Sequence, residues 1–148
     1  MHAPCSGERY SSAIFRSEQF VYTAFNLFEE YKKNGSFIVK DIFAHTMDSL
    51  LKKDKTLYTE LPSEGVVTLM KSSKEPRYMN HLLYGTPVRR GENIEVIEDI
   101  VPPYQVKVEL RIPEKVEKVV CVPQMTELPS TQDCGVLCYT VPKVDCAK

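Results

Sequence analysis

Three carboxylates, Glu95, Glu98 and Asp99, are close enough in sequence to suggest acid–base chemistry. Two carboxylates held at a set separation can hydrolyse a glycosidic bond. Here they follow the basic pair Arg89 and Arg90 by a few residues, which favours a solvated strand end beside a basic turn. We therefore assign no catalytic residue to this chain.

Four polar residues in the same stretch could instead bind a ligand. Arg89 and Arg90 could hold a phosphate or a carboxylate through paired hydrogen bonds, or form salt bridges to nearby glutamates such as Glu92. Asn80 and His81 could hydrogen-bond a sugar, or form a satisfied interior or interface pair. The candidate ligand-binding residues are therefore Asn80, His81, Arg89 and Arg90.

The cysteine pattern favours reduced thiols over a metal site or a disulfide framework. The five cysteines are Cys5, Cys121, Cys134, Cys138 and Cys146. Their number is odd, their spacing is irregular, and no export signal precedes them. Cys134 and Cys138 are four apart in a segment that resembles a strand, with Cys146 as the nearest third ligand. Zinc sites usually combine two close pairs, so we expect no metal.

Motifs tied to known catalytic loops are absent. The sequence contains no GxGxxG, GxxxxGK[ST], GxSxG or HExxH. The three histidines, His2, His45 and His81, belong to different predicted elements, so no local signature supports a His-activated nucleophile. We expect no cofactor.

Composition indicates an ordinary globular protein. The 148 residues are 43% hydrophobic and 26% charged, enough for one domain or two small ones. A net charge of -1 gives no electrostatic footprint for nucleic acid or an anionic membrane. No apolar run approaches the roughly 20 residues that span a bilayer. The first residues lack a basic and then apolar signal region, so we expect a cytoplasmic protein.

The N-terminal third predicts one strand and two helices. Residues 1–18 are polar and suggest a lead-in, and residues 20–25 suit a buried strand. Asn26 with Glu29 resembles a capping box, and Asn34-Gly35 suits a helix stop. A second helix is predicted from Ser36 to about Lys53. One strand with two apolar helix faces is an incomplete layer, because the helices need a sheet to cover.

The remainder predicts short antiparallel strands. After a polar connector at 54–64, strands are expected at 66–71, 77–84, 94–97, 106–112, 118–122 and 135–141. The strongest alternation covers 106–112, where Val106, Val108, Leu110 and Ile112 share one face. The predicted fold is therefore α+β, with a partial α/β segment at 1–60 and a small antiparallel β-sandwich at 61–148.

Three segments carry a family resemblance: HLLYGTPVRRG, IEVIEDIVPPYQVKVEL and VPQMTELP. They closely resemble the C-terminal region of bacterial glycoside hydrolase-like proteins related to family 42 β-galactosidases. Upstream, FVYTAFNLFEEYKKNGSFIVKDIFAHTMDSLL resembles the end of the amidotransferase-like, trimerisation-type domain of that group. The resemblance covers about Gln19 to Val144. It departs at VDCAK, where the family continues through a last apolar strand, and in its cysteines.

The resemblance implies a catalytic barrel, an amidotransferase-like domain and a terminal sandwich in the whole protein. The family's catalytic carboxylates lie in the barrel, and no residue of this chain matches them. The expected function is therefore non-catalytic assembly and support within a glycoside hydrolase-like protein of carbohydrate metabolism. Its expected partners are the α/β domain of the parent chain or subunits of a homo-oligomer. The alternatives are a small carbohydrate-binding module that takes an oligosaccharide and a free-standing protein that self-associates.

Overall fold

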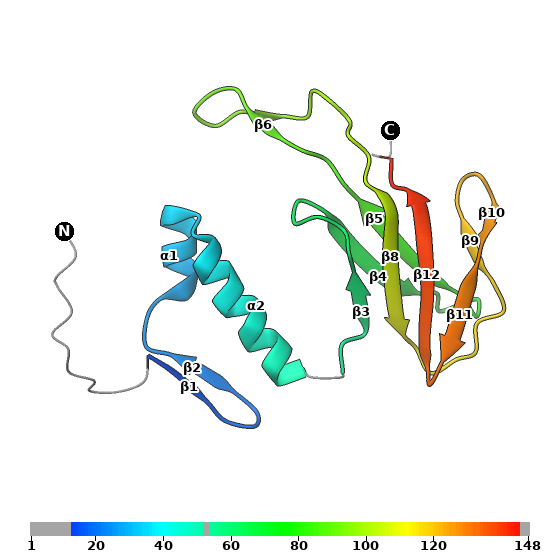
Figure 1. Cartoon of the computed structure of the whole chain (residues 1–148), viewed down its shortest axis with the longest axis horizontal. Coiled ribbons are helices and arrows are strands. Elements are labelled where there is room, and N and C mark those ends of the chain that lie inside the picture. The colour runs from blue at the N-terminus through cyan, green and yellow to red at the C-terminus, as the bar shows by residue number, and fades with distance from the viewer. Residues whose placement is uncertain (1–12, 52–53, 146–148) are drawn as a thin grey trace, which may run out of the picture. The chain divides into compact units, whose positions relative to one another are not determined.

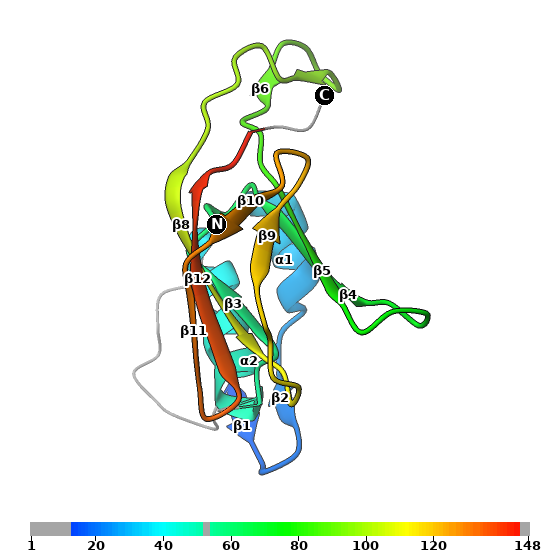
Figure 2. The ribbon, with the colours of Figure 1, turned by 90° about the vertical axis from the view of Figure 1, so that its right-hand side faces the viewer.

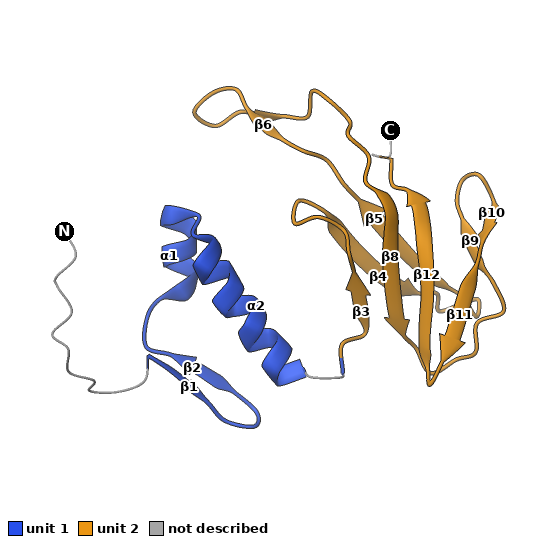
Figure 3. Cartoon of the chain, viewed as in Figure 1, with its two compact units in different colours: residues 1–54 blue, residues 55–148 orange. Residues whose placement is uncertain are grey.

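The structure, a computed structural model, describes residues 13–51 and 54–145 (Figure 1). The chain forms two compact units, Met1–Asp54 and Lys55–Lys148 (Figure 3). The first contains helices and a hairpin, and the second contains antiparallel strands, which confirms the predicted α+β class with a sandwich-like part. The sequence placed the change between the two parts at about residue 60, whereas the units divide after Asp54.

Unit 1 consists of a β-hairpin followed by two helices. The strands β1 (Ile14–Arg16) and β2 (Val21–Thr23) pair antiparallel, and α1 (Leu27–Asn34) and α2 (Phe37–Leu51) follow. The predicted lead-in over residues 1–18 is wrong at β1. This strand has only three residues, which are too few to show a strand pattern in the sequence. The predicted end of the second helix at Lys53 lies outside the described residues.

The ends of α1 follow the predicted stop more closely than the predicted start. Gly35 has φ 57° and donates its N–H to the Tyr31 carbonyl at 2.8 Å, which confirms the left-handed C-cap. At the start, the Asn26 side chain makes no cap to a backbone amide. It donates to the Glu29 carboxylate at 2.7 Å instead, so the predicted capping box is wrong.

Unit 2 contains a four-stranded antiparallel sheet in the order β11-β12-β8-β3. The strands are β3 (Leu57–Thr59), β8 (Tyr104–Arg111), β11 (Ser130–Asp133) and β12 (Val136–Lys143). Strand β3 lies inside the predicted connector and pairs with β8, which corrects that prediction. Strand β11 was also not predicted, because its sequence STQD has no apolar alternation.

Three further strand pairs complete unit 2. Strands β4 (Val66–Lys71) and β5 (Tyr78–Leu83) form a hairpin, β9 (Val119–Cys121) pairs with β10 (Thr126–Leu128), and β6 (Val88–Arg89) pairs with β7 (Glu95–Val96). Figures 1 and 2 show the β4–β5 hairpin crossing one face of the four-stranded sheet. The two layers give the sandwich-like arrangement.

The core of unit 2 lies between these layers. The alternating residues of 106–112 are all buried, and Val108 is fully inaccessible, which confirms the strongest period-2 prediction. From β12, Leu137, Tyr139 and Val141 join them, and Leu69 and Leu82 cover them from the hairpin. Strand alternation therefore leaves the opposite face of the sheet polar.

The β11–β12 turn is a tight two-residue connection. Cys134 has φ 47° and Gly135 has φ 78°, so both central residues adopt the left-handed conformation of a type I′ turn. Asp133 and Val136 pair on either side of it. Cys134 thus belongs to the turn and not to the strand-like segment in which the sequence placed it with Cys138.

Candidate binding surfaces

Asn80 and His81, predicted to share a ligand, point to opposite sides of β5. The half-buried Asn80 faces the sandwich interior, where its Nδ2 donates to the Tyr139 hydroxyl at 2.7 Å. Burial raises the pKa of Tyr139, and Asn80 partly offsets this. His81 is exposed. The structure therefore does not bring these two side chains together, and it supports the interior role for Asn80 alone.

Asn80 is only partly satisfied in that position. Its Oδ1 is inaccessible and has no hydrogen-bond partner in the described structure. A buried acceptor left without a partner costs about 1–3 kcal/mol. The Asn80–Tyr139 hydrogen bond thus links the two layers at the cost of one unpaired buried oxygen. The sequence did not identify Tyr139 as the partner of Asn80.

Arg89 and Arg90 bind within their own hairpin. Arg89 donates through Nε to the Gly91 carbonyl at 3.1 Å and through a terminal nitrogen to the Glu92 carbonyl. Arg90 donates through Nε to the Glu98 carboxylate at 2.8 Å and pairs with it again through a terminal nitrogen. Arg90 thus matches the salt-bridge alternative, although with Glu98 as its partner, whereas Arg89 binds backbone carbonyls.

None of the three clustered carboxylates has the environment of a catalytic acid. Glu95, Glu98 and Asp99 are all exposed. Arg90 lowers the pKa of Glu98, whereas a general acid needs a raised pKa so that it carries a proton at neutral pH. The geometry of this stretch therefore offers no acid–base pair.

The thiols and histidines are dispersed in the described part of the chain. Cys121, Cys134 and Cys138 are free, and no group of three His, Cys, Asp or Glu side chains in residues 13–51 and 54–145 could hold a metal. His45 lies exposed on α2. His2, Cys5 and Cys146 lie outside the described residues.

A carboxylate that sequence reasoning missed joins the two layers of unit 2. Glu114 accepts hydrogen bonds from Lys71 Nζ and, at 2.7 Å, from the Tyr78 hydroxyl. The Lys71 ammonium is the main cause that lowers the pKa of Glu114 to about 2. Gln132 holds the same loop by donating to the Glu114 carbonyl at 2.8 Å and accepting from Val116 N–H. This cluster, on the surface, is structural.

Unit 1 presents a large apolar surface. Leu27 is the one buried hydrophobic residue among its described residues, and α2 buries none. Phe28 and Phe43 pack edge to face, with ring centroids 5.4 Å apart, yet Phe28 remains 67% exposed. The exposed large apolar residues of unit 1, which we call the unit 1 apolar surface, are Ile14, Phe15, Phe20, Tyr22, Phe28, Tyr31, Phe37, Ile38, Phe43 and Leu51. Exposed apolar residues scattered singly are ordinary on a protein surface, whereas large apolar patches mark interaction sites.

Unit 2 carries a second exposed apolar segment. Residues 87–101, which we call the β6–β7 arm, are exposed throughout. The arm extends beyond the four-stranded sheet in Figure 1. Its exposed aliphatic residues are Val88, Ile94, Val96, Ile97, Ile100 and Val101. Arg89 and Arg90 hold this hairpin together through contacts within the arm. The hairpin nevertheless buries almost none of its own apolar side chains.

One solved structure shows what this chain is similar to. α-L-Fucosidase isoenzyme 2 from Paenibacillus thiaminolyticus matches with a TM-score of 0.92 and 42% sequence identity over 98% of this chain. The match covers 22% of the fucosidase, so this chain spans about a fifth of that protein's length. No protein-family profile and no curated protein matches the chain. The chain is therefore related to a glycoside hydrolase.

No helix among the described residues is long and apolar enough to cross a bilayer.

Proposed function

We propose that this chain is the non-catalytic C-terminal accessory and assembly region of a glycoside hydrolase-like protein related to family 42 β-galactosidases. The unit 1 apolar surface carries the proposal, since two helices and a hairpin with one buried hydrophobic residue need another protein surface to cover them. The fucosidase match supports it, because 78% of that chain lies outside the region that resembles this one.

The partner in this proposal is the α/β domain of the parent chain. Residues 20–51 resemble the end of an amidotransferase-like domain. The sheet of that domain would be the one that α1 and α2 cover. The β6–β7 arm adds a second apolar contact. Neither surface carries a strong charge of one sign, which suits an obligate and mainly hydrophobic interface.

Activity of the purified chain tests the non-catalytic half of the proposal. We expect no turnover of aryl α-L-fucosides or aryl β-galactosides, because the exposed carboxylates lack an acid–base arrangement. Turnover that is lost in Glu95→Gln or Glu98→Gln would overturn the proposal. The parent-length protein, with the same substitutions, serves as the positive control and should keep its activity.

Binding of a hydrophobic dye tests the docking half. We expect the purified chain to bind anilinonaphthalene sulfonate strongly, and the triple variant Phe28→Ser, Phe37→Ser, Phe43→Ser to bind much less. Replacement of exposed polar residues on the same helices, such as Lys32→Ser, is the matched control. Weak dye binding by the unaltered monomeric chain would contradict an unfilled interface.

Self-association is the second candidate, because the same apolar surface can be covered by another copy. Light scattering over micromolar concentrations separates the two cases. A defined oligomer that the phenylalanine triple variant dissociates would favour a free-standing self-associating protein. A polydisperse or chaperone-dependent chain that becomes monodisperse when produced with the upstream region would favour the assembly role.

A further inference from the structure

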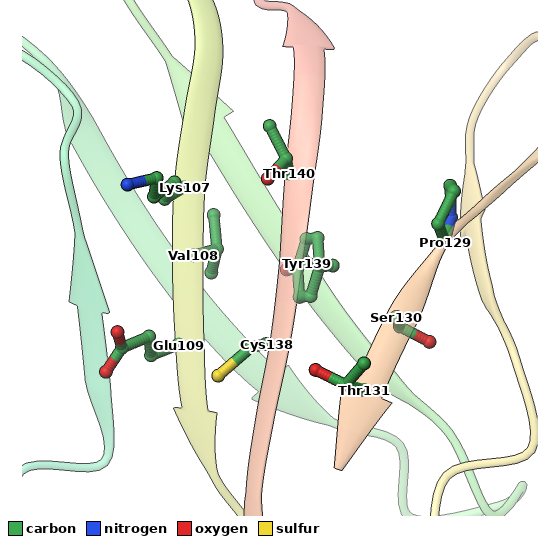
Figure 4. A pocket seen from close by; sticks show the side chains of 9 residues that line it. All are labelled: Lys107, Val108, Glu109, Pro129, Ser130, Thr131, Cys138, Tyr139 and Thr140. Carbon is green, nitrogen blue, oxygen red and sulfur yellow. The ribbon is translucent and has the colours of Figure 1, made fainter.

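The outer face of the four-stranded sheet contains a hollow of about 300 Å³ (Figure 4). It lies across β8, β12 and β11, and its polar lining comes from Lys107, Glu109, Thr131, Cys138 and Thr140. Val108 and Tyr139 also border it. Their side chains belong to the core, so the hollow rests on their backbone.

Strand register places the polar side chains in continuous cross-strand rows. Thr131 is opposite Cys138, Cys138 is opposite Glu109, and Glu109 is opposite Tyr58 on β3. Lys107 is opposite Thr140 in the next row. Directly opposite side chains lie about 5 Å apart, so these residues form one connected patch that ends at the ring of Tyr58, which is 50% exposed.

The polar side chains of this patch make few interactions within the protein. The side chains of Glu109, Thr131 and Thr140 make no hydrogen bond or ion pair in the structure over residues 13–51 and 54–145. Lys107 reaches only Glu60, at 3.6 Å. A carboxylate and two hydroxyls are thus free to accept and donate to a ligand.

The chemistry of the patch fits a neutral sugar better than other ligands. Arginine forks that would hold a phosphate are absent from its lining, and Pro129 is the one exposed apolar side chain in it, which is little for an apolar peptide. Pyranose rings combine a hydroxyl edge with an apolar face. Carboxylates bind hydroxyl protons in strong charge-assisted hydrogen bonds, and a tyrosine ring offers an apolar platform.

We propose that this hollow is a binding subsite for a neutral oligosaccharide. The Tyr58 ring packs on the apolar face of a sugar unit, and Glu109, Thr131 and Thr140 hydrogen-bond its hydroxyls. The site is separate from Asn80, His81, Arg89 and Arg90. It also goes beyond the assembly role, which rests on the unit 1 apolar surface and the β6–β7 arm and on none of these residues.

The first experiment titrates the ¹⁵N-labelled full chain with neutral oligosaccharides that contain L-fucose, D-galactose or D-glucose. We expect saturable shifts of the backbone amides of residues 107–109, 130–131 and 138–140. Glu109→Ala and Tyr58→Ala should each weaken binding at least about tenfold, since each removes a principal contact. Glu127→Ala, which removes an exposed carboxylate of β10, should change binding less than about twofold.

The second experiment follows the thiol of Cys138, which is half-buried and lines the hollow. A bound sugar should slow its modification by a thiol reagent, with the modified residue located by mass spectrometry. Cys134, exposed in the turn, is the internal control and should react at an unchanged rate. Thr131→Val preserves shape and should reduce both the protection and the shifts.

Two outcomes would overturn the proposal. One is the absence of shifts and of Cys138 protection with every sugar at millimolar concentration. The other is binding that maps to the β6–β7 arm, or that Glu109→Ala leaves unchanged in a variant with unaltered circular dichroism. Light scattering on the same samples reports assembly independently, so failure of the sugar site and failure of the assembly role are distinguishable.

Discussion

At the scale of single residues, two glycines in the left-handed conformation set the path of the backbone. Gly35 ends α1 and Gly135 completes the β11–β12 turn, as their conformational freedom predicts. Partners far apart in the chain were not predictable. Tyr139, which receives the hydrogen bond of Asn80, and Glu114, which receives those of Lys71 and Tyr78, depend on how distant strands stack.

Cys134→Asn should stabilise the protein by about 0.5–1 kcal/mol, because asparagine tolerates the left-handed conformation better than cysteine. Urea unfolding followed by circular dichroism measures it. Gly135→Ala is the paired control. It should destabilise the protein because alanine tolerates a φ of 78° poorly. A clash does not contribute, since the added Cβ would lie at an ordinary 3.6 Å from the Ile112 carbonyl. Equal stability in all three proteins would contradict a left-handed turn.

Glu114 should make stability depend on pH in the acid range. Its pKa is lowered from 4.5 to about 2 on folding, so its contribution is present above pH 4.5 and is lost as pH falls toward 2. The stability difference between the protein and Glu114→Gln should therefore disappear between these values. Glu117→Gln is the matched exposed control. A difference that stays undiminished as the pH falls from 5 to 2 would exclude the ionised carboxylate as its cause.

At the scale of elements, strands with their own apolar alternation were predictable and strands defined by their neighbours were not. Residues 106–112 alternate because one face is buried, and the structure confirms it. Strands β3 and β11 contain three and four residues and owe their pairing to β8 and β12. Asn80 and His81 are neighbours on β5, so strand alternation alone places their side chains on opposite faces. The sequence could not show that the face of Asn80 would be covered by Tyr139, because that contact depends on how the layers pack.

The Asn80–Tyr139 contact can be measured by a double-mutant cycle. Tyr139→Phe should destabilise by about 1–3 kcal/mol, because it leaves the Asn80 amide without its acceptor. Asn80→Leu combined with Tyr139→Phe should recover much of that loss, since no buried polar group remains unpaired. Denaturant melts give the coupling. Additive effects of the two substitutions would show that the pair does not interact.

At the scale of the whole molecule, the two units differ in how much of their apolar surface they bury. Unit 2 has a cluster of nine buried residues, whereas unit 1 buries Leu27 alone among its described hydrophobic residues. The sequence predicted this imbalance, because one strand is too small a sheet to cover two apolar helix faces. In our proposal, the surface that covers the unit 1 apolar surface comes from the α/β domain of the parent chain.

Hydrogen exchange on the full chain should separate the units. Amides of β8 and β12 should exchange slowly, and those of α1 and α2 should exchange orders of magnitude faster, because sparse burial makes local opening easy. If the proposed parent α/β domain covers α1 and α2, its presence should slow exchange of the helix amides and leave that of the strand amides unchanged. Helix amides as protected as those of β8 in the chain alone would contradict an unfilled docking surface.

The strand order of unit 2 has a consequence for crowded conditions. The two eight-residue strands, β8 and β12, lie inside the sheet, and the edges are β3 and β11. Three or four residues offer a neighbouring chain too few backbone hydrogen bonds to template strand addition. The four-stranded sheets of neighbouring copies can therefore lie close together without adding strands to one another at these edges. Aggregation of the isolated chain should start at the exposed aromatic residues of α1 and α2, and mild detergent should reverse it.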